Sequence, residues 1–180
     1  MQVAGLFRRA VCAQHGRVKR LLIIWHSFTG GTARMAEEAA QGAAGETGTA
    51  TVLLRAAMAG PEDVLAADGY IFAGPENLAA MAGVQKDFFD RCYYPLLGRI
   101  EGRPYACMVC AGTDGENAAR QVARIATGWR LRAVAPPLII RTGAQTPEAI
   151  LAPKTIGLAD LRLCAELGLS LAAGLALGIF

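Results

Sequence analysis

Long hydrophobic runs and charged residues are scarce in this sequence of 180 residues. Its longest uncharged run near the C-terminus, Leu167 to Phe180, has 14 residues and three glycines, whereas a membrane-spanning helix needs about 20 apolar residues. Charged residues make up 18% and hydrophobic ones 53%, which excludes a highly charged, disordered chain. We therefore expect one packed globular domain without a membrane span.

Histidine and cysteine are also too few and too scattered for a metal centre or a disulfide framework. His15 and His26 are the two histidines, and neither has a cysteine or carboxylate at metal-ligand spacing. The five cysteines are odd in number and lack framework spacing, which favours a reducing, cytoplasmic location. Cys107 and Cys110 match C-x-x-C, but in an apolar strand they would point to opposite faces. We expect structural thiols and no metal.

The positive charge is confined to the N-terminal segment. The formal net charge is +3, but residues 1–20 hold five bases and no acid, so residues 21–180 carry a net charge of −2. Because the charge belongs to an end segment, we do not expect nucleic-acid binding. Residues 1–20 lack the uninterrupted apolar stretch of a secretory signal, so we interpret them as a loose basic extension of a domain over residues 21–180.

From residue 20 onward, apolar runs of strand length alternate with segments of helical period. This alternation predicts a parallel sheet covered by helices on both faces. The predicted strands are Leu21 to Trp25, Ala50 to Arg55, Tyr70 to Ala73, Tyr105 to Ala111 and Ala133 to Ile140. The predicted helices are Thr32 to Ala44, Gly83 to Leu97, Gly115 to Gly128 and Gly157 to Leu177, with a short turn at Pro61 to Leu65. Ligands of such sheets bind beyond the carboxyl ends of the strands, so the loops after the first, third and fourth strands are the candidate site.

The loop after the first strand has the composition of a phosphate-binding loop. It contains Ser27, Phe28, Thr29, Gly30, Gly31 and Thr32 directly before a predicted helix. Backbone N–H groups, hydroxyls and the helix dipole can together hold a phosphate there without Lys or Arg. The loop matches neither the nucleoside-triphosphatase nor the dinucleotide glycine pattern, so a monoester phosphate fits best. The alternative is a capped helix whose hydroxyls satisfy the first free amides.

The loop after the fourth strand contains Ala111, Gly112, Thr113, Asp114 and Gly115. Its two glycines permit the backbone to approach a flat ligand closely, while Thr113 and Asp114 would cap the next helix. An ordinary strand-to-helix turn is the alternative. After the third strand, we expect Pro75 to break the strand ladder and turn the chain over the sheet edge.

Two motifs resemble known families. The pattern S-x-T-G-x-T of the first loop resembles the flavodoxin family, in which this loop binds the phosphate of FMN. The segment Asp68–Asn77, followed by Met81–Gly83 and Lys86–Arg91, is similar to the third-strand loop and third helix of flavodoxin-like NAD(P)H:quinone oxidoreductases. The resemblance extends from about Leu21 to Ala173. It implies an α/β flavodoxin-like three-layer sandwich with a five-stranded parallel sheet in the order 2-1-3-4-5.

The resemblance also implies a non-covalent FMN site built from the three loops. Besides the residues of the first and last loops, it assigns to cofactor binding Pro75, Glu76, Asn77 and Leu78. Asn77 and the amides around it would meet the uracil-like edge of the flavin, although a solvated polar turn is the alternative. Relatives place an aromatic residue over the flavin where this chain has Leu78–Ala80. Phe28 could lie beside one face of the ring, with the other face open or covered by a partner subunit.

These observations lead to an FMN-dependent oxidoreductase that passes electrons from NAD(P)H to a quinone or similar acceptor. The flavin would carry the chemistry, so no side chain is assigned a catalytic role. The main alternative is a flavodoxin-type one-electron carrier, although such carriers are usually far more acidic than net −2. A third possibility is an interaction module without flavin.

The last predicted helix is apolar around most of its circumference, whereas a helix on a sheet needs only one apolar stripe. We therefore expect a homodimer that buries the remaining leucines. The alternative is that Leu175–Phe180 folds back onto its own domain.

Overall fold

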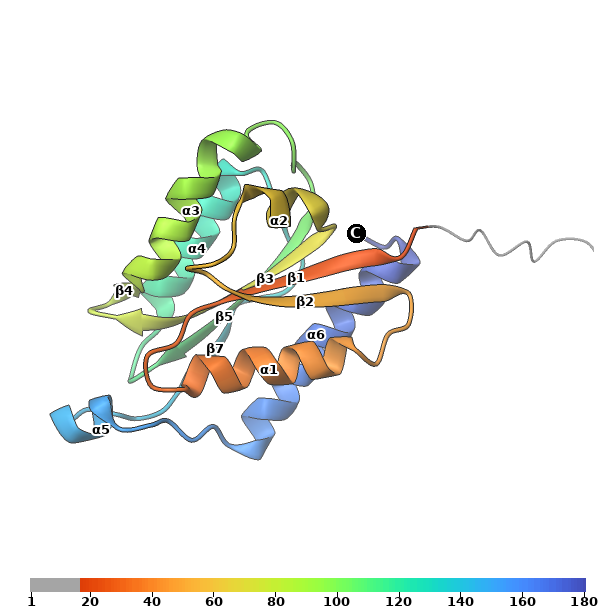
Figure 1. Cartoon of the computed structure of the whole chain (residues 1–180). Coiled ribbons are helices and arrows are strands. Elements are labelled where there is room, and N and C mark those ends of the chain that lie inside the picture. The colour runs from red at the N-terminus through yellow and green to blue at the C-terminus, as the bar shows by residue number, and fades with distance from the viewer. Residues whose placement is uncertain (1–16) are drawn as a thin grey trace, which may run out of the picture.

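A central sheet lies between two layers of helices in the computed structural model, which describes residues 17–180 (Figure 1). The strands are β1 (Lys19–Trp25), β2 (Thr49–Arg55), β3 (Gly69–Asn77), β4 (Ala80–Met81), β5 (Pro104–Ala111), β6 (Arg132–Ala133) and β7 (Leu138–Arg141). The helices are α1 (Gly31–Ala43), α2 (Pro61–Ala66), α3 (Gly83–Leu96), α4 (Glu116–Gly128), α5 (Pro147–Leu151) and α6 (Leu158–Leu177). Residues 1–16, most of the predicted basic extension, lie outside the described residues.

The strand order confirms the predicted flavodoxin-like topology. The sheet runs β2-β1-β3-β5-β6, with β7 also paired to β5. Hence β6 and β7 together occupy the fifth position of the order 2-1-3-4-5. All pairs in the sheet are parallel except β3 with β4, which form a hairpin. Within residues 17–180 no helix is long and apolar enough to cross a membrane.

Both faces of the sheet are buried, which explains the uninterrupted apolar runs. In β1, Leu21 and Ile23 pack beneath α1 and α6, whereas Leu22 and Ile24 pack in the opposite core with α3 and α4. Cys107 and Cys110 of β5 likewise belong to opposite cores, as their spacing predicted. Successive strand residues point to opposite faces, so a strand covered on both sides is apolar throughout.

The prediction of one continuous fifth strand over Ala133–Ile140 was wrong. Residues 134–137, which include Pro136 and Pro137, separate β6 from β7. Proline has no N–H to donate to a ladder, so two consecutive prolines are found at a sheet edge or a break. The interruption lies on the outer edge of the sheet, where it also disfavours edge-to-edge pairing.

Pro75 does not break the ladder as predicted, because β3 continues through it to Asn77. Pro75 pairs with Cys110 in the register of β3 and β5. The ladder between β1 and β3 ends at Trp25 and Ala73. In a strand, residues 73 and 75 direct their backbone N–H and C=O groups toward the same neighbouring strand, here β1. Because β1 has already ended beside residue 75, the N–H that Pro75 lacks would have had no partner there.

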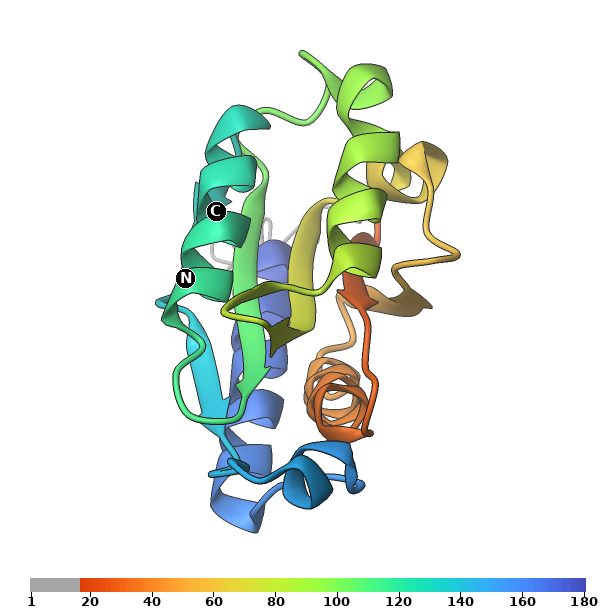
Figure 2. The same cartoon turned by 90° about the vertical axis from the view of Figure 1, so that its left-hand side faces the viewer.

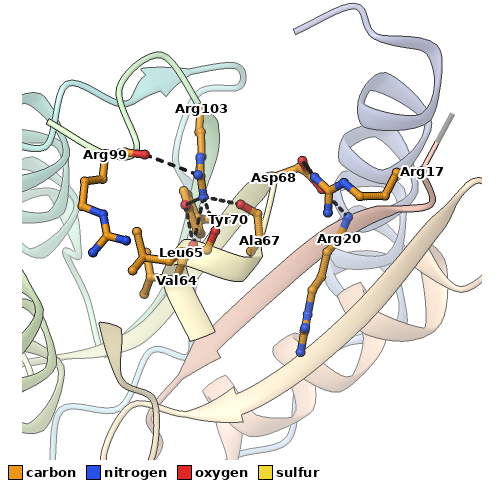
Figure 3. A network of polar contacts seen from close by, with 9 residues as sticks. All are labelled: Arg17, Arg20, Val64, Leu65, Ala67, Asp68, Tyr70, Arg99 and Arg103. Carbon is orange, nitrogen blue, oxygen red and sulfur yellow. Dashed lines mark hydrogen bonds and ion pairs between the residues drawn. The ribbon is translucent and has the colours of Figure 1, made fainter. Parts of the chain in front are cut away.

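Arginine and aspartate side chains connect the loops at the end of the sheet where the strands begin, which is the end opposite the candidate site (Figure 3). The Arg103 guanidinium donates to the carbonyls of Val64 and Leu65 at 3.1 and 3.0 Å and to the Tyr70 hydroxyl at 3.0 Å. It thereby caps the C-terminal end of α2. Nearby, Asp68 accepts from the backbone N–H of Arg20 at 2.8 Å.

Helices α1 and α6 pack backbone against backbone. A Cβ on Gly168 would lie 1.9 Å from the Ala39 carbonyl oxygen, and one on Gly42 would lie 2.0 Å from that of Ala165. At the end of α6, the Phe180 ring covers Gly174, where a Cβ would lie 2.0 Å from the ring. The contact between α1 and α6 is therefore made by glycines and backbone atoms instead of large apolar side chains.

This close contact gives a first prediction. Gly168→Ala should lower the free energy of unfolding by about 1–3 kcal/mol, because the methyl group meets backbone that cannot move without separating the helices. Gly128→Ala is the matched control: a Cβ there meets nothing within 4 Å at the end of α4. The control should be neutral or raise stability by up to about 1 kcal/mol. Urea denaturation of both variants checks this, and equal effects would contradict the packing argument.

Candidate functional site

A cavity of about 500 Å³ lies beyond the carboxyl ends of β1, β3 and β5. Figure 2 looks onto this edge of the sheet, with the β3–β4 hairpin on one side and α5 on the other. The predicted residues that line the cavity are Ser27, Phe28, Thr29, Thr32, Pro75, Glu76, Asn77, Leu78, Ala111, Gly112 and Thr113. The volume falls in the ~300–1,000 Å³ range of small-molecule sites.

Four predicted residues do not line the cavity but shape its loops: Gly30, Gly31, Asp114 and Gly115. Seven lining residues were missed by sequence reasoning: Ala79, Cys110, Thr142, Ala144, Ile150, Leu151 and Lys154. The last five follow β7, in a segment with no predicted site residue.

The first loop places the N-terminus of α1 at the cavity. Gly30 precedes the helix with φ +87°, a conformation that side chains rarely adopt, and its N–H donates to Ser27 Oγ at 3.1 Å. Gly31 begins the helix, and a Cβ there would lie 2.7 Å from Cys110 Sγ. The helix has no side-chain cap, and within residues 17–180 the buried Thr32 Oγ1 makes no regular hydrogen bond and has only a weak contact with the Cys110 thiol. The Thr32 hydroxyl therefore does not serve as a helix cap and is available to a ligand.

The second wall is the hairpin of β3 and β4. Glu76 pairs with Met81 and Asn77 with Ala80, so Leu78 and Ala79 form a two-residue turn. Both turn residues have positive φ, 49° and 57°, although neither is glycine. Two-residue hairpins favour such angles, but each costs a non-glycine residue about 1–2 kcal/mol. Leu78 at the tip is fully exposed and lines the cavity.

Helix α4 holds this hairpin through three polar contacts. Glu76 Oε2 accepts from the Gly115 N–H at 2.9 Å. Asn117 Nδ2 donates to the Ala79 carbonyl at 2.6 Å, and Gln121 Oε1 accepts from the Met81 N–H at 2.9 Å. Sequence reasoning missed Asn117 and Gln121, although two amides spaced by four residues on one helix face were a possible signal. The contacts explain how the turn keeps its strained backbone.

Glu76 also leaves one oxygen unused. Its Oε1 atom is buried and has no hydrogen-bond partner in the part of the chain that the structure describes. A buried carboxylate oxygen without a donor is costly. The cavity therefore offers an acceptor to a ligand N–H beside the hairpin.

The third wall is the missed helix α5 and the residues after it. Thr146 caps this helix, its Oγ1 accepting from the Ala149 N–H at 3.3 Å, and Pro147 is its first residue. A threonine followed by proline is a helix-start signal that the sequence analysis overlooked. Ile150 and Leu151 of this helix are exposed and line the cavity.

The charges near the cavity are few. Burial and, secondarily, the charge of Arg55 lower the pKa of His26, whose ring lies edge-on to Phe28 at 4.5 Å between centroids. Burial raises the pKa of the Cys110 thiol. Among residues 17–180, no three His, Cys, Asp or Glu side chains are grouped so as to hold a metal ion.

The α3 motif that carries part of the family resemblance is remote from the cavity. Arg91 donates to the carbonyls of Ala59 and Ala56 at 3.0 and 2.9 Å, and its Nε contacts Asp87 at 2.7 Å. These bonds attach α3 to the loop between β2 and α2. The motif therefore has a structural role in this chain.

The strained turn gives a second prediction. Ala79→Gly should raise the free energy of unfolding by about 1 kcal/mol, because glycine adopts the positive φ of this position without strain. Ala80→Gly, one residue later in β4, is the control and should lower stability by about 0.5–1 kcal/mol. Denaturant unfolding of the two variants measures the difference. A loss of stability in both would show that the turn carries no strain.

Comparisons with known proteins agree with this geometry. Residues 56–144, just under half of the chain, match the family model described as NADPH-dependent FMN reductase. A flavodoxin from Aquifex aeolicus is 38% identical over 84 residues, a match that covers 47% of this chain and 45% of that protein.

Solved structures show the same fold. A flavodoxin from the domain Archaea is 16% identical with a TM-score of 0.70, covering 87% of this chain and 98% of that one. A flavodoxin, WrbA-like protein from Agrobacterium tumefaciens is 20% identical with a TM-score of 0.63, covering 86% and 96%. The chain therefore has a flavodoxin-like fold, and part of it is similar in sequence to the NADPH-dependent FMN reductase family and to a flavodoxin.

Proposed function

We propose that this chain binds FMN non-covalently in the cavity and passes electrons from NAD(P)H through it to a quinone or similar acceptor. The observation that carries the proposal is the pair of unpartnered buried oxygens, Thr32 Oγ1 and Glu76 Oε1, whose residues line one cavity from different loops. One suits a phosphate and the other a ring N–H, which are the polar groups at the two ends of FMN. The flavin supplies hydride and electron transfer when bound, and the protein supplies its position.

The phosphate end would rest on the first loop. The free amides at the start of α1 and the hydroxyls of Ser27, Thr29 and Thr32 surround one end of the cavity. The helix dipole adds a positive potential there. Gly30 and Gly31 let the backbone take this shape.

The ring end would lie between the hairpin and the third loop. Glu76 Oε1 and the Asn77 side chain offer polar contacts to its uracil-like edge. Ala111, Gly112 and Thr113 also line the cavity, while Asp114 accepts from the Glu116 N–H and Gly115 directly precedes α4. Leu78 takes the position at which relatives carry an aromatic cover.

An apolar cavity mouth favours a small acceptor over a protein partner. Phe28, Leu78, Ile150 and Leu151 line the cavity and are all exposed, by 52% or more. Carriers that dock proteins rely on charge to steer the encounter. An uncharged, flat molecule such as a quinone suits this surface better.

The second candidate is a flavodoxin-type one-electron carrier without its own NAD(P)H activity. The curated relative and several structural neighbours are named flavodoxins, which supports it. An interaction module that has lost flavin has less support, because two unpartnered buried oxygens in one cavity favour a small-molecule ligand.

Self-association remains a proposal of its own. Along α6, Leu163, Leu169 and Leu177 are 47%, 43% and 73% exposed, although Phe180 folds back onto the helix. A homodimer would cover these leucines. Light scattering of the full chain at micromolar concentration tests for the homodimer, and a monomeric mass would exclude it.

The phosphate contacts give a third prediction. Replacing Thr29 and Thr32 together by Ala should weaken FMN binding by about 2–4 kcal/mol, at ~1–2 kcal/mol per hydrogen bond to a charged group. Riboflavin, which lacks the phosphate, should bind the variant and the original chain equally. Thr127→Ala is the control, since its hydroxyl bonds the Ala123 carbonyl on α4 outside the cavity. Fluorescence titration measures both ligands, and equal affinity of the original chain for FMN and riboflavin would refute the phosphate site.

The electron donor gives a fourth prediction. Mixing the FMN-loaded protein with NADH or NADPH in a stopped-flow instrument should bleach the flavin absorbance, and a benzoquinone should restore it. If neither nicotinamide reduces the flavin while a one-electron donor does, the carrier replaces the enzyme as the function.

A further inference from the structure

A lysine lies against the phosphate loop, although the loop itself contains no cation. Lys154 follows α5, more than 100 residues after the loop, and its backbone N–H donates to the Thr29 carbonyl at 2.7 Å. Its Cβ is 3.1 Å from the place that a Cβ on Gly31 would occupy. Lys154 also lines the cavity. The chain therefore brings a long cationic side chain to the start of α1.

No acid neutralises this cation. Among residues 17–180, Lys154 takes part in no ion pair, whereas Arg34 and Arg141 near the same edge are paired with glutamates. Its ammonium donates to the carbonyls of Ala149, Ile150 and Ala152 at 2.7, 2.8 and 2.6 Å. These neutral carbonyls at the end of α5 engage all three donors of the ammonium without cancelling its charge, so an anion would bind it by displacing a carbonyl.

The positive charge of Lys154 also acts on Cys110, which lies beneath the first loop. Burial raises the pKa of the Cys110 thiol, and the positive charge of Lys154 opposes that rise. Cys110 Sγ lies 2.7 Å from the Cβ position of Gly31. The electrostatic potential of Lys154 is therefore positive at the first turn of α1.

We propose that Lys154 is a phosphate-binding residue, whose ammonium supplies the positive charge that the first loop lacks. This rests on the proposed function, because it concerns the phosphate monoester of the same ligand. The buried and unpartnered Thr32 hydroxyl on the loop is the independent sign that an anion is received there. A helix N-terminus offers only about half a positive charge to a phosphate, so a lysine beside it adds substantial attraction.

The proposal also links the phosphate to α5. The four-carbon stem of Lys154 is rooted beside Gly31, and rotation about its bonds exchanges the α5 carbonyls for a phosphate oxygen. Riboflavin has no phosphate oxygen to replace the α5 carbonyls as a partner of the Lys154 ammonium. Lys154 should therefore discriminate between FMN and riboflavin.

The test compares the dissociation constants of FMN and riboflavin in Lys154→Gln and in the original chain. FMN should bind about 10-fold more weakly to the variant, which corresponds to one charge-assisted hydrogen bond, and riboflavin should bind within twofold of the original. The salt dependence of FMN binding should also fall. Lys154→Arg should keep most of the FMN affinity. Lys86→Gln is the control, because Lys86 pairs with Asp90 on α3 and does not line the cavity.

The outcomes separate this proposal from the one on which it rests. If FMN and riboflavin weaken equally in Lys154→Gln, the lysine only holds α5 in place and the proposal is overturned. It is also overturned if the variant binds FMN as the original chain does. If the original chain binds no FMN, the proposed function itself fails.

Discussion

The direct contact of α1 with α6 and β5 is the constraint on which the site depends. Gly42 and Gly168 let the two helices meet at their backbones, and Gly31 lets the first turn of α1 approach the Cys110 thiol. A side chain at any of these positions would push α1 away from its neighbours. The N-terminus of α1 lies at the cavity because the helix is fixed along its length and at its first residue.

The opposite wall depends on a different kind of constraint. The hairpin turn at Leu78 and Ala79 has a backbone that these residues do not prefer, and α4 holds it through Asn117, Gln121 and the Gly115 N–H. A strained conformation persists only where its surroundings fix it. The exposed Leu78 side chain is thus presented at a defined place at the cavity mouth.

The sequence predicted the fold well because its signals were local and repeated. Buried parallel strands appear as apolar runs, and glycine and hydroxyl residues marked the first loop. The errors arose where two elements combine. Pro75 continues β3 because β1 has already ended beside it, and the break at Pro136 and Pro137 depends on the edge position.

The site was only partly predictable for the same reason. The three loops follow strands whose ends must converge, so their residues could be grouped without a structure. Lys154 and Ile150 follow the last strand, and only the path of the chain back to Thr29 brings them to the cavity. No pattern within either segment encodes that contact.

As an enzyme, the chain would combine a phosphate site formed by two distant segments with an apolar cavity entrance. The loop would supply amides and hydroxyls, and Lys154 would supply the charge. Aliphatic side chains on the hairpin and on α5 take the place of an aromatic cover. In the proposed complex this arrangement would expose the flavin ring to small apolar acceptors.

The visible absorption spectrum of the protein shows whether the cavity binds FMN. The purified chain is mixed with excess FMN, passed through a desalting column and scanned. We expect the protein fraction to retain the flavin bands at about one flavin per chain, as one cavity for one ligand requires. A colourless protein fraction, with all flavin in the salt volume, would contradict it.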